Sequence, residues 1–203
     1  MTLNRLIKRA FLATTLPLLT ACIGGSSPPS QFYMLEPIRG AEPGPSAAER
    51  SRVVLALAPV RIPQYVDRPQ IVTATATNAY QLSEFNRWAE RLDDNISRVL
   101  AQNLGTLVPA DVVPANASNL AKQAAVRVNV SFLEFHVDPQ GQARTVADWR
   151  ISQGENTVVS RRSSYREPAS TTDYRVMAGA LNACLNRLSR EIADSVRTVV
   201  RAR

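Results

Sequence analysis

Segment 174–199 carries the feature that most restricts how this chain can fold, a single apolar stripe at helical spacing. The apolar side chains recur there at steps of three and four residues: Tyr174, Met177, Leu181, Cys184, Leu185, Leu188, Ile192, Val196 and Val199. This spacing places them along one side of a long amphipathic helix. Most of the stability of such a helix comes from packing that side against other elements. The rest of the chain must therefore supply a broad apolar surface.

Several strand-like segments can supply that surface. Residues 125–137 alternate best, with Val126, Val128, Val130 and Phe132 on one side and polar residues on the other. The other predicted strands, of which the last lies at an edge of the sheet, are 32–35, 53–60, 71–77, 145–152 and 157–165.

A second amphipathic helix is predicted upstream of the long strand, with its start between Ser83 and Glu90. Its apolar positions are Phe85, Trp88, Leu92, Ile96, Val99, Leu100 and Leu104. Each helix has one apolar stripe, so both are expected to pack on a sheet. The sequence therefore predicts an α+β domain with a mixed, largely antiparallel sheet and two long helices packed on one face.

The long strand changes phase after Phe132. Beyond it, Leu133, Phe135 and Val137 carry the apolar character, on the side that was polar before. One explanation is a β-bulge that turns these side chains inward. The other is an apolar end of the sheet that a second subunit or a partner covers. In that case the three residues are contacts of a homo-oligomer, such as a ring.

The N-terminus has the pattern of a bacterial lipoprotein signal. Basic residues precede a short apolar run, which ends in Leu19-Thr20-Ala21-Cys22. A basic segment, a short apolar segment and small residues before a cleavage point are typical of a secretory signal, and lipoproteins are lipidated on a cysteine at the next position. We expect residues 1–21 to be a signal peptide, Cys22 to be lipidated, 22–30 to be a tether and 31–203 to be one domain.

The expected lipid anchor bears on location. Two or more acyl chains hold a protein stably on a bilayer without crossing it. Aspartate after the lipidated cysteine usually retains Gram-negative lipoproteins at the inner membrane, and Ile23 stands there instead. The protein is therefore expected on the periplasmic face of the outer membrane, where nucleic acid is not a partner.

The sequence offers little catalytic chemistry. His136 is the one histidine, and Cys184 is the one cysteine besides the lipidation site. Typical zinc sites need several such ligands close together, and neither a G-x-S-x-G elbow nor a phosphate-binding loop is present. His136 is expected to be exposed and Cys184 to be a buried apolar side chain. We expect no enzymatic activity, no metal and no cofactor.

Two motifs near the middle of the chain resemble a known family. Pro63-Gln64-Tyr65-Val66-Asp67-Arg68-Pro69-Gln70-Ile71-Val72 is followed by Glu84-Phe85-Asn86-Arg87-Trp88-Ala89-Glu90. With the lipoprotein signal, they are similar to the PqiC/YmbA family of ABC-type transport auxiliary lipoproteins. Arg91 stands where the family places a proline after Trp-Ala-Glu. A proline would suit the first turn of a helix, so the difference leaves the start of the second helix open.

The resemblance implies a non-enzymatic lipoprotein that works with MCE-domain proteins in lipid transport between the two membranes. The expected role is a docking or scaffold subunit that supports membrane integrity, with a PqiB-like MCE protein as its partner. The alternative is a carrier module that holds a lipid in its own pocket between the helices and the sheet.

Tyr65, Asp67 and Arg68 are candidate contacts with that partner. The structural alternative is that Asp67 and Arg68 pair with each other and brace a rigid loop, with Tyr65 packed on it. The two prolines of the motif restrict the residues before them to extended conformations, which suits either role.

Overall fold

The computed structural model describes residues 28–39, 53–116 and 119–202. The predicted signal peptide, Cys22 and most of the predicted tether lie outside the described residues. The elements are β1 (Gln31–Tyr33), β2 (Val54–Leu57), β3 (Gln70–Ala76), β4 (Ala79–Trp88), α3 (Leu92–Leu107), β5 (Asp111–Pro114), α4 (Asn119–Lys122), β6 (Val126–Val137), β7 (Gln142–Gln153), β8 (Asn156–Pro168) and α5 (Tyr174–Arg201). Within the described ranges, no helix is both long and apolar enough to cross a membrane.

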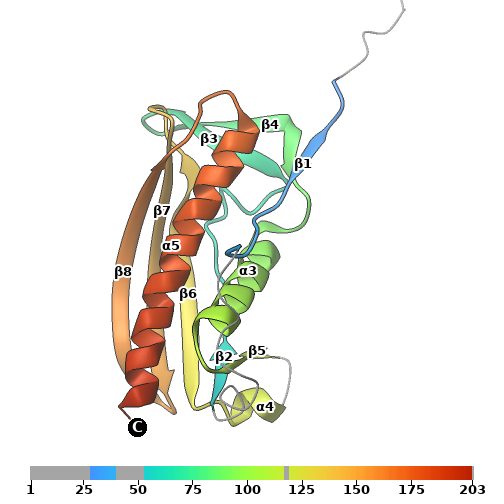
Figure 1. The fold of residues 1–203 in the computed structure, drawn as a ribbon. Coiled ribbons are helices and arrows are strands. Elements are labelled where there is room, and N and C mark those ends of the chain that lie inside the picture. The colour runs from blue at the N-terminus through green and yellow to red at the C-terminus, as the bar shows by residue number, and fades with distance from the viewer. Residues whose placement is uncertain (1–27, 40–52, 117–118, 203) are drawn as a thin grey trace, which may run out of the picture.

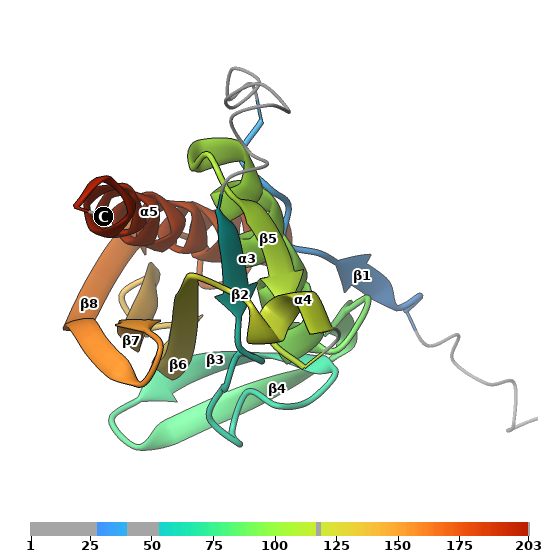
Figure 2. The ribbon, with the colours of Figure 1, turned by 90° about the horizontal axis from the view of Figure 1, so that it is seen from below.

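One mixed sheet forms the frame of the domain. Its strand order is β1-β4-β3-β6-β2-β5, with β7 paired to β6 and β8 paired to β7. The most extensive pairings, β6 with β7 and β7 with β8, are antiparallel, whereas β2 runs parallel to both β5 and β6. The long strand β6 meets β2 near its start and β3 at its end, so the sheet curls as it passes through β6 (Figure 2).

The two long helices lie on the same side of the sheet and pack against each other (Figures 1 and 2). Asp173 is the N-cap of α5, and its carboxylate accepts hydrogen bonds from the backbone N–H groups of Arg175 and Val176. Cys184 is buried on the apolar side of α5, as predicted. The core between the helices and the sheet includes Ile96, Val99, Leu100, Val128, Trp149, Ile151, Leu181, Leu185 and Leu188. The predicted α+β architecture is confirmed.

The second helix begins later than predicted. Phe85 and Trp88 belong to strand β4, and α3 starts at Leu92. The N–H of Trp88 donates to the carbonyl of Pro69 at 2.7 Å, and β4 pairs with β3 through a turn in which Asn78 has a φ of 61°. The apolar positions before α3 have a spacing compatible with a helix, but cross-strand hydrogen bonds satisfy this backbone instead.

The phase change in β6 is a β-bulge. The register between β6 and β7 shifts between Phe132 and Glu134. Leu133 is the extra residue and is 41% exposed, whereas Phe135 is 2% exposed and Val137 is also in the core. The predicted role of Phe135 and Val137 as subunit contacts is therefore wrong, because the bulge turns both into the interior. Leu133 stays on the surface.

Asparagine side chains fasten the segment after β1 to the two long helices. Asn95 of α3 holds Leu35 at both ends: its Oδ1 accepts from the N–H at 2.7 Å and its Nδ2 donates to the carbonyl at 3.2 Å. Asn182 of α5 accepts from the N–H of the next residue, and Asn103 of α3 accepts from the N–H of Ile38. The N-terminal segment thus joins the domain at a defined place.

Candidate functional site

A hollow of about 630 Å³ opens to solvent where the β3–β4 hairpin meets the end of β6. We call it the aromatic notch and define it by Tyr65, Tyr80, Leu133 and His136. Two of these residues, Tyr65 from the family-like motif and Leu133 from the bulge, are predicted contact residues. The notch therefore joins two surface predictions that the sequence left separate.

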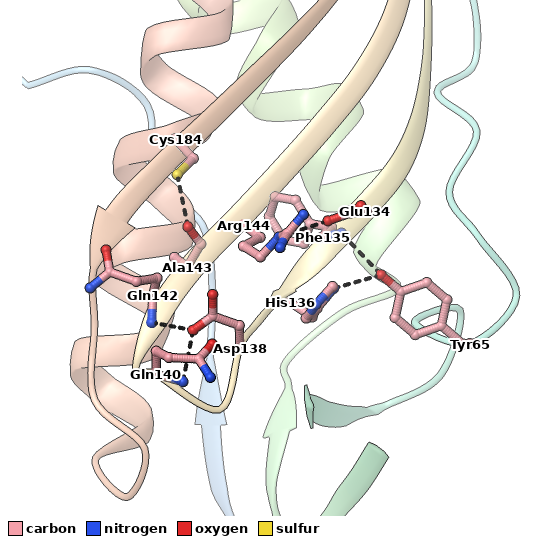
Figure 3. Close-up of polar contacts among 10 residues, drawn as sticks. All are labelled: Tyr65, Glu134, Phe135, His136, Asp138, Gln140, Gln142, Ala143, Arg144 and Cys184. Atoms are coloured by element: carbon pink, nitrogen blue, oxygen red, sulfur yellow. Dashed lines mark hydrogen bonds and ion pairs between the residues drawn. The ribbon is translucent and has the colours of Figure 1, made fainter. Parts of the chain in front are cut away.

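Three rings form the wall of the notch. The ring centroids of Tyr65 and Tyr80 are 5.1 Å apart, and His136 lies edge-on to both, at 5.8 Å and 5.5 Å. The Tyr65 hydroxyl accepts the backbone N–H of Phe135 at 3.2 Å and lies 2.8 Å from His136 Nδ1 (Figure 3). Offset and edge-on ring pairs are favourable beyond the area they bury. Tyr65 is therefore fixed in place, while Tyr80 remains half exposed.

A rigid turn carries Tyr65 to this position. The carbonyl of Pro63 accepts from the N–H groups of Val66 and Asp67, at 3.1 Å and 3.2 Å. The Val66 side chain is buried and anchors the turn. Proline fixes φ at the start of this turn, so the loop needs little ordering before Tyr65 can contact His136.

The charged neighbours of the notch are held in place by an ion pair and by backbone hydrogen bonds. Glu134 and Arg144 join across β6 and β7 at 2.9 Å (Figure 3). The Asp138 carboxylate braces the β6–β7 turn by accepting from the backbone N–H groups of Gln140 and Gln142, at 3.0 Å and 2.9 Å. The rim of the notch is therefore polar and carries one more carboxylate than guanidinium.

Burial shifts the pKa values of two side chains in the notch, His136 and Tyr65. It lowers the pKa of the His136 imidazole; the Glu134 carboxylate opposes this effect and the Arg144 guanidinium adds to it. Burial also raises the pKa of the Tyr65 hydroxyl to about 12. His136 is therefore neutral at pH 7 and the Tyr65 hydroxyl keeps its proton, so the pair forms a neutral hydrogen bond.

His136 should make the stability of the domain depend on pH. Its pKa is depressed in the folded state, so the unfolded chain binds the proton more readily. The contribution of His136 is present above its unfolded pKa of about 6.5 and is lost as the pH falls through the folded value. Urea unfolding at pH 8 and pH 5 should show a smaller loss of stability for His136→Gln than for wild type. Equal losses in the two proteins would contradict this role.

The two family-like motifs lie side by side in the structure. Asp67 and Arg68 of the first motif do not form the ion pair considered from the sequence. Asp67 lies 3.9 Å from Arg91 at the start of α3 instead, and Gln70 lies opposite Arg87 in the sheet. Among the described residues, the Arg68 guanidinium has no hydrogen-bond or ion-pair partner. The structural alternative is therefore corrected: Asp67 lies near Arg91 rather than pairing with Arg68.

The sequence reasoning missed two residues of the notch. His136 is buried rather than exposed as predicted, because the Tyr65 loop covers it. The sequence indicates no role for Tyr80, because its segment shows no strand pattern although it forms part of β4. The local feature that could have pointed to Tyr80 is its place two positions after Asn78, at a hairpin turn.

The described residues show no arrangement suited to holding a metal. No group of three or more His, Cys, Asp or Glu side chains comes together among them. The notch combines apolar and aromatic side chains with a charged rim. Such a surface suits contact with another macromolecule.

Residues 33–193 match the family described as the ABC-type transport auxiliary lipoprotein component, and the chain belongs to this family. The match confirms the resemblance drawn from the two motifs.

Curated relatives refine that placement. The chain is 27% identical over 154 residues to the intermembrane transport lipoprotein PqiC of Escherichia coli (strain K12), covering 75% of this chain and 79% of the relative. PqiC of Shigella flexneri matches with the same identity and coverage.

Solved structures share the fold. A crystal structure of an uncharacterized protein superposes with a TM-score of 0.69 at 19% identity, covering 83% of this chain and 99% of that one. A protein from Xanthomonas campestris superposes with a TM-score of 0.64 at 17% identity, covering 81% and 93%. At these identities the likeness concerns the fold alone.

Proposed function

We propose that this auxiliary lipoprotein is a non-enzymatic docking subunit of an MCE-type system that moves lipid between the two membranes. The aromatic notch is the observation that carries the proposal. In it, Tyr65 from the family-like motif and Leu133 from the bulge converge on one open surface. The match to PqiC, named as an intermembrane transport lipoprotein, supports the transport setting.

The proposal includes the N-terminal arrangement. Residues 1–21 act as the signal peptide, Cys22 carries the lipid, and a tether through residue 30 leads into one domain. Ile23 directs the protein to the outer membrane, where it faces the periplasm. The family description as a lipoprotein supports this arrangement.

Docking fits the geometry better than lipid carriage. The space between the helices and the sheet is filled by buried side chains such as Trp149, Leu181 and Leu185. The notch itself is open and rimmed by the Glu134–Arg144 pair. A lipid carrier needs a mostly apolar cavity that surrounds the acyl chains, and neither region provides one.

The notch has the composition of a contact hot spot. Aromatic residues are enriched at the centres of protein interfaces, with polar residues around them that exclude water. Tyr80 and Leu133 supply the exposed apolar surface, and the ring of the fixed Tyr65 packs against that of Tyr80. We propose that an MCE-domain protein of the PqiB type binds here, with Arg68 on the adjoining loop.

Leu133→Asp is expected to weaken binding to the MCE-domain partner about tenfold or more, because it places a charge among apolar contacts. Surface-immobilised partner and purified protein would give the dissociation constants. Leu120→Asp is the matched control, since Leu120 has a similar exposure on α4, outside the notch. The docking role is contradicted when both variants bind as tightly as wild type while urea unfolding shows both folded.

We also propose that identical subunits assemble on the membrane. Among the strands that the structure describes, β8 pairs with β7 alone, and an unpaired strand edge is a template for association. Light scattering on the purified protein tests this: a species larger than one subunit is expected, and a monomer at high micromolar concentration would contradict it.

A further inference from the structure

A second apolar surface lies on the β1–β4 pair, apart from the notch. Phe32 is 64% exposed and Phe85 is 40% exposed, and Met34 is exposed as well. Phe32 lies opposite Arg87 in the parallel pairing of β1 with β4. Phe85 lies two positions before Arg87 on this neighbouring strand, and Met34 is the first residue after β1. We call these three residues the anchor-side patch.

The patch lies close in sequence to the proposed lipid. Residues 23–27 separate Cys22 from Pro28, the first described residue. An extended chain spans at most about 3.3–3.6 Å per residue, so Phe32 stands no more than roughly 35 Å from the lipidated position. The asparagine contacts to Leu35 and Ile38 hold the following segment on α3. The proposed lipid anchor is therefore attached to the domain on the side that bears the patch.

The chemistry of the patch matches a membrane interface. Phenylalanine and methionine side chains enter the boundary between headgroups and acyl chains, and arginine reaches the headgroup phosphates from an apolar surface. Arg87 lies opposite Phe32 in the strand pairing, and its one ion-pair partner among the described residues is Glu84 at 3.5 Å. Its Nε also donates to the Glu84 carbonyl at 2.8 Å, and its side chain is about one third exposed.

We propose that the anchor-side patch inserts into the interface of the bilayer that holds the lipid anchor, which sets the orientation of the domain and turns its other surfaces toward the periplasm. This inference rests on the proposed lipidation of Cys22. It adds a second, orienting membrane contact made by Phe32, Met34 and Phe85.

The test uses the mature lipidated protein, reconstituted in vesicles of phosphatidylethanolamine and phosphatidylglycerol that contain doxyl-labelled lipid. Phe85→Cys carries an NBD fluorophore, and Val158→Cys carries it in the control. Val158 is the exposed third residue of β8, a strand that begins at the end of the sheet away from β1 (Figure 1). Cys184 is buried and stays unlabelled.

Position 85 should show a blue-shifted emission that the doxyl lipid quenches, and position 158 should show neither. Adding Phe32→Ser and Met34→Ser should return the emission at position 85 to that of a water-exposed probe. Vesicle flotation separates the two claims. Protein that floats with an unshifted probe at position 85 overturns membrane insertion but leaves anchoring in place, and protein that fails to float overturns both. A shift that requires the MCE-domain partner would assign the patch to that protein and overturn the inference.

Discussion

Phe135→Asp is expected to abolish folding of the domain. Phe135 is fully buried and packs edge-on against Phe132, with ring centroids 5.5 Å apart. Truncating a buried phenylalanine costs about 3–5 kcal/mol, and a buried, unpaired carboxylate adds a further penalty. The sum approaches the whole stability of an ordinary domain, about 5–15 kcal/mol. Circular dichroism and urea unfolding should show no cooperative transition.

Leu133→Asp is the control for that variant, because Leu133 is two positions away but lies on the outside of the bulge. Its free energy of unfolding should lie within about 0.5 kcal/mol of the wild-type value, as is usual for surface substitutions. A Phe135→Asp protein with a wild-type unfolding transition would mean that the phase change exposes Phe135 rather than burying it.

Cys22→Ser is expected to remove essentially all of the protein from the membrane fraction. The proposed anchor depends on acyl chains attached to this one residue, and stable anchoring needs two or more of them. Membrane flotation with immunoblotting would measure the distribution, and intact mass would show whether the acyl chains are present.

Cys184→Ala is the matched control for the anchor, since it removes the other cysteine of the chain from a buried site on α5. It should leave the membrane fraction unchanged. A Cys22→Ser protein that stays with outer membranes as firmly as wild type would contradict the anchoring proposal.

The parts of the fold that sequence could predict are those with a strong local period. The stripe of α5 and the alternation of β6 and β7 each repeat over many residues, so local sequence suffices for them. The helix prediction was wrong for Phe85 and Trp88, because their spacing fits a helix while the strand conformation of β4 depends on pairing with β3. Such tertiary pairing leaves little trace in the segment itself.

The candidate site divides in the same way. The motif singled out Tyr65, and the phase change singled out Leu133, but nothing local places them together. His136 lies 71 positions beyond Tyr65 in the chain, and only the folded sheet brings their polar atoms to 2.8 Å. Phe135 and Val137 illustrate the limit, because a bulge and an exposed apolar edge give the same sequence pattern.

Native mass spectrometry of the protein extracted from its membrane in mild detergent tests the central claim most directly. A docking subunit should appear bound to an MCE-domain protein and free of stoichiometric phospholipid, because the space between its helices and sheet is filled. A protein that carries one phospholipid per chain and no MCE-domain partner would contradict the account and identify a carrier.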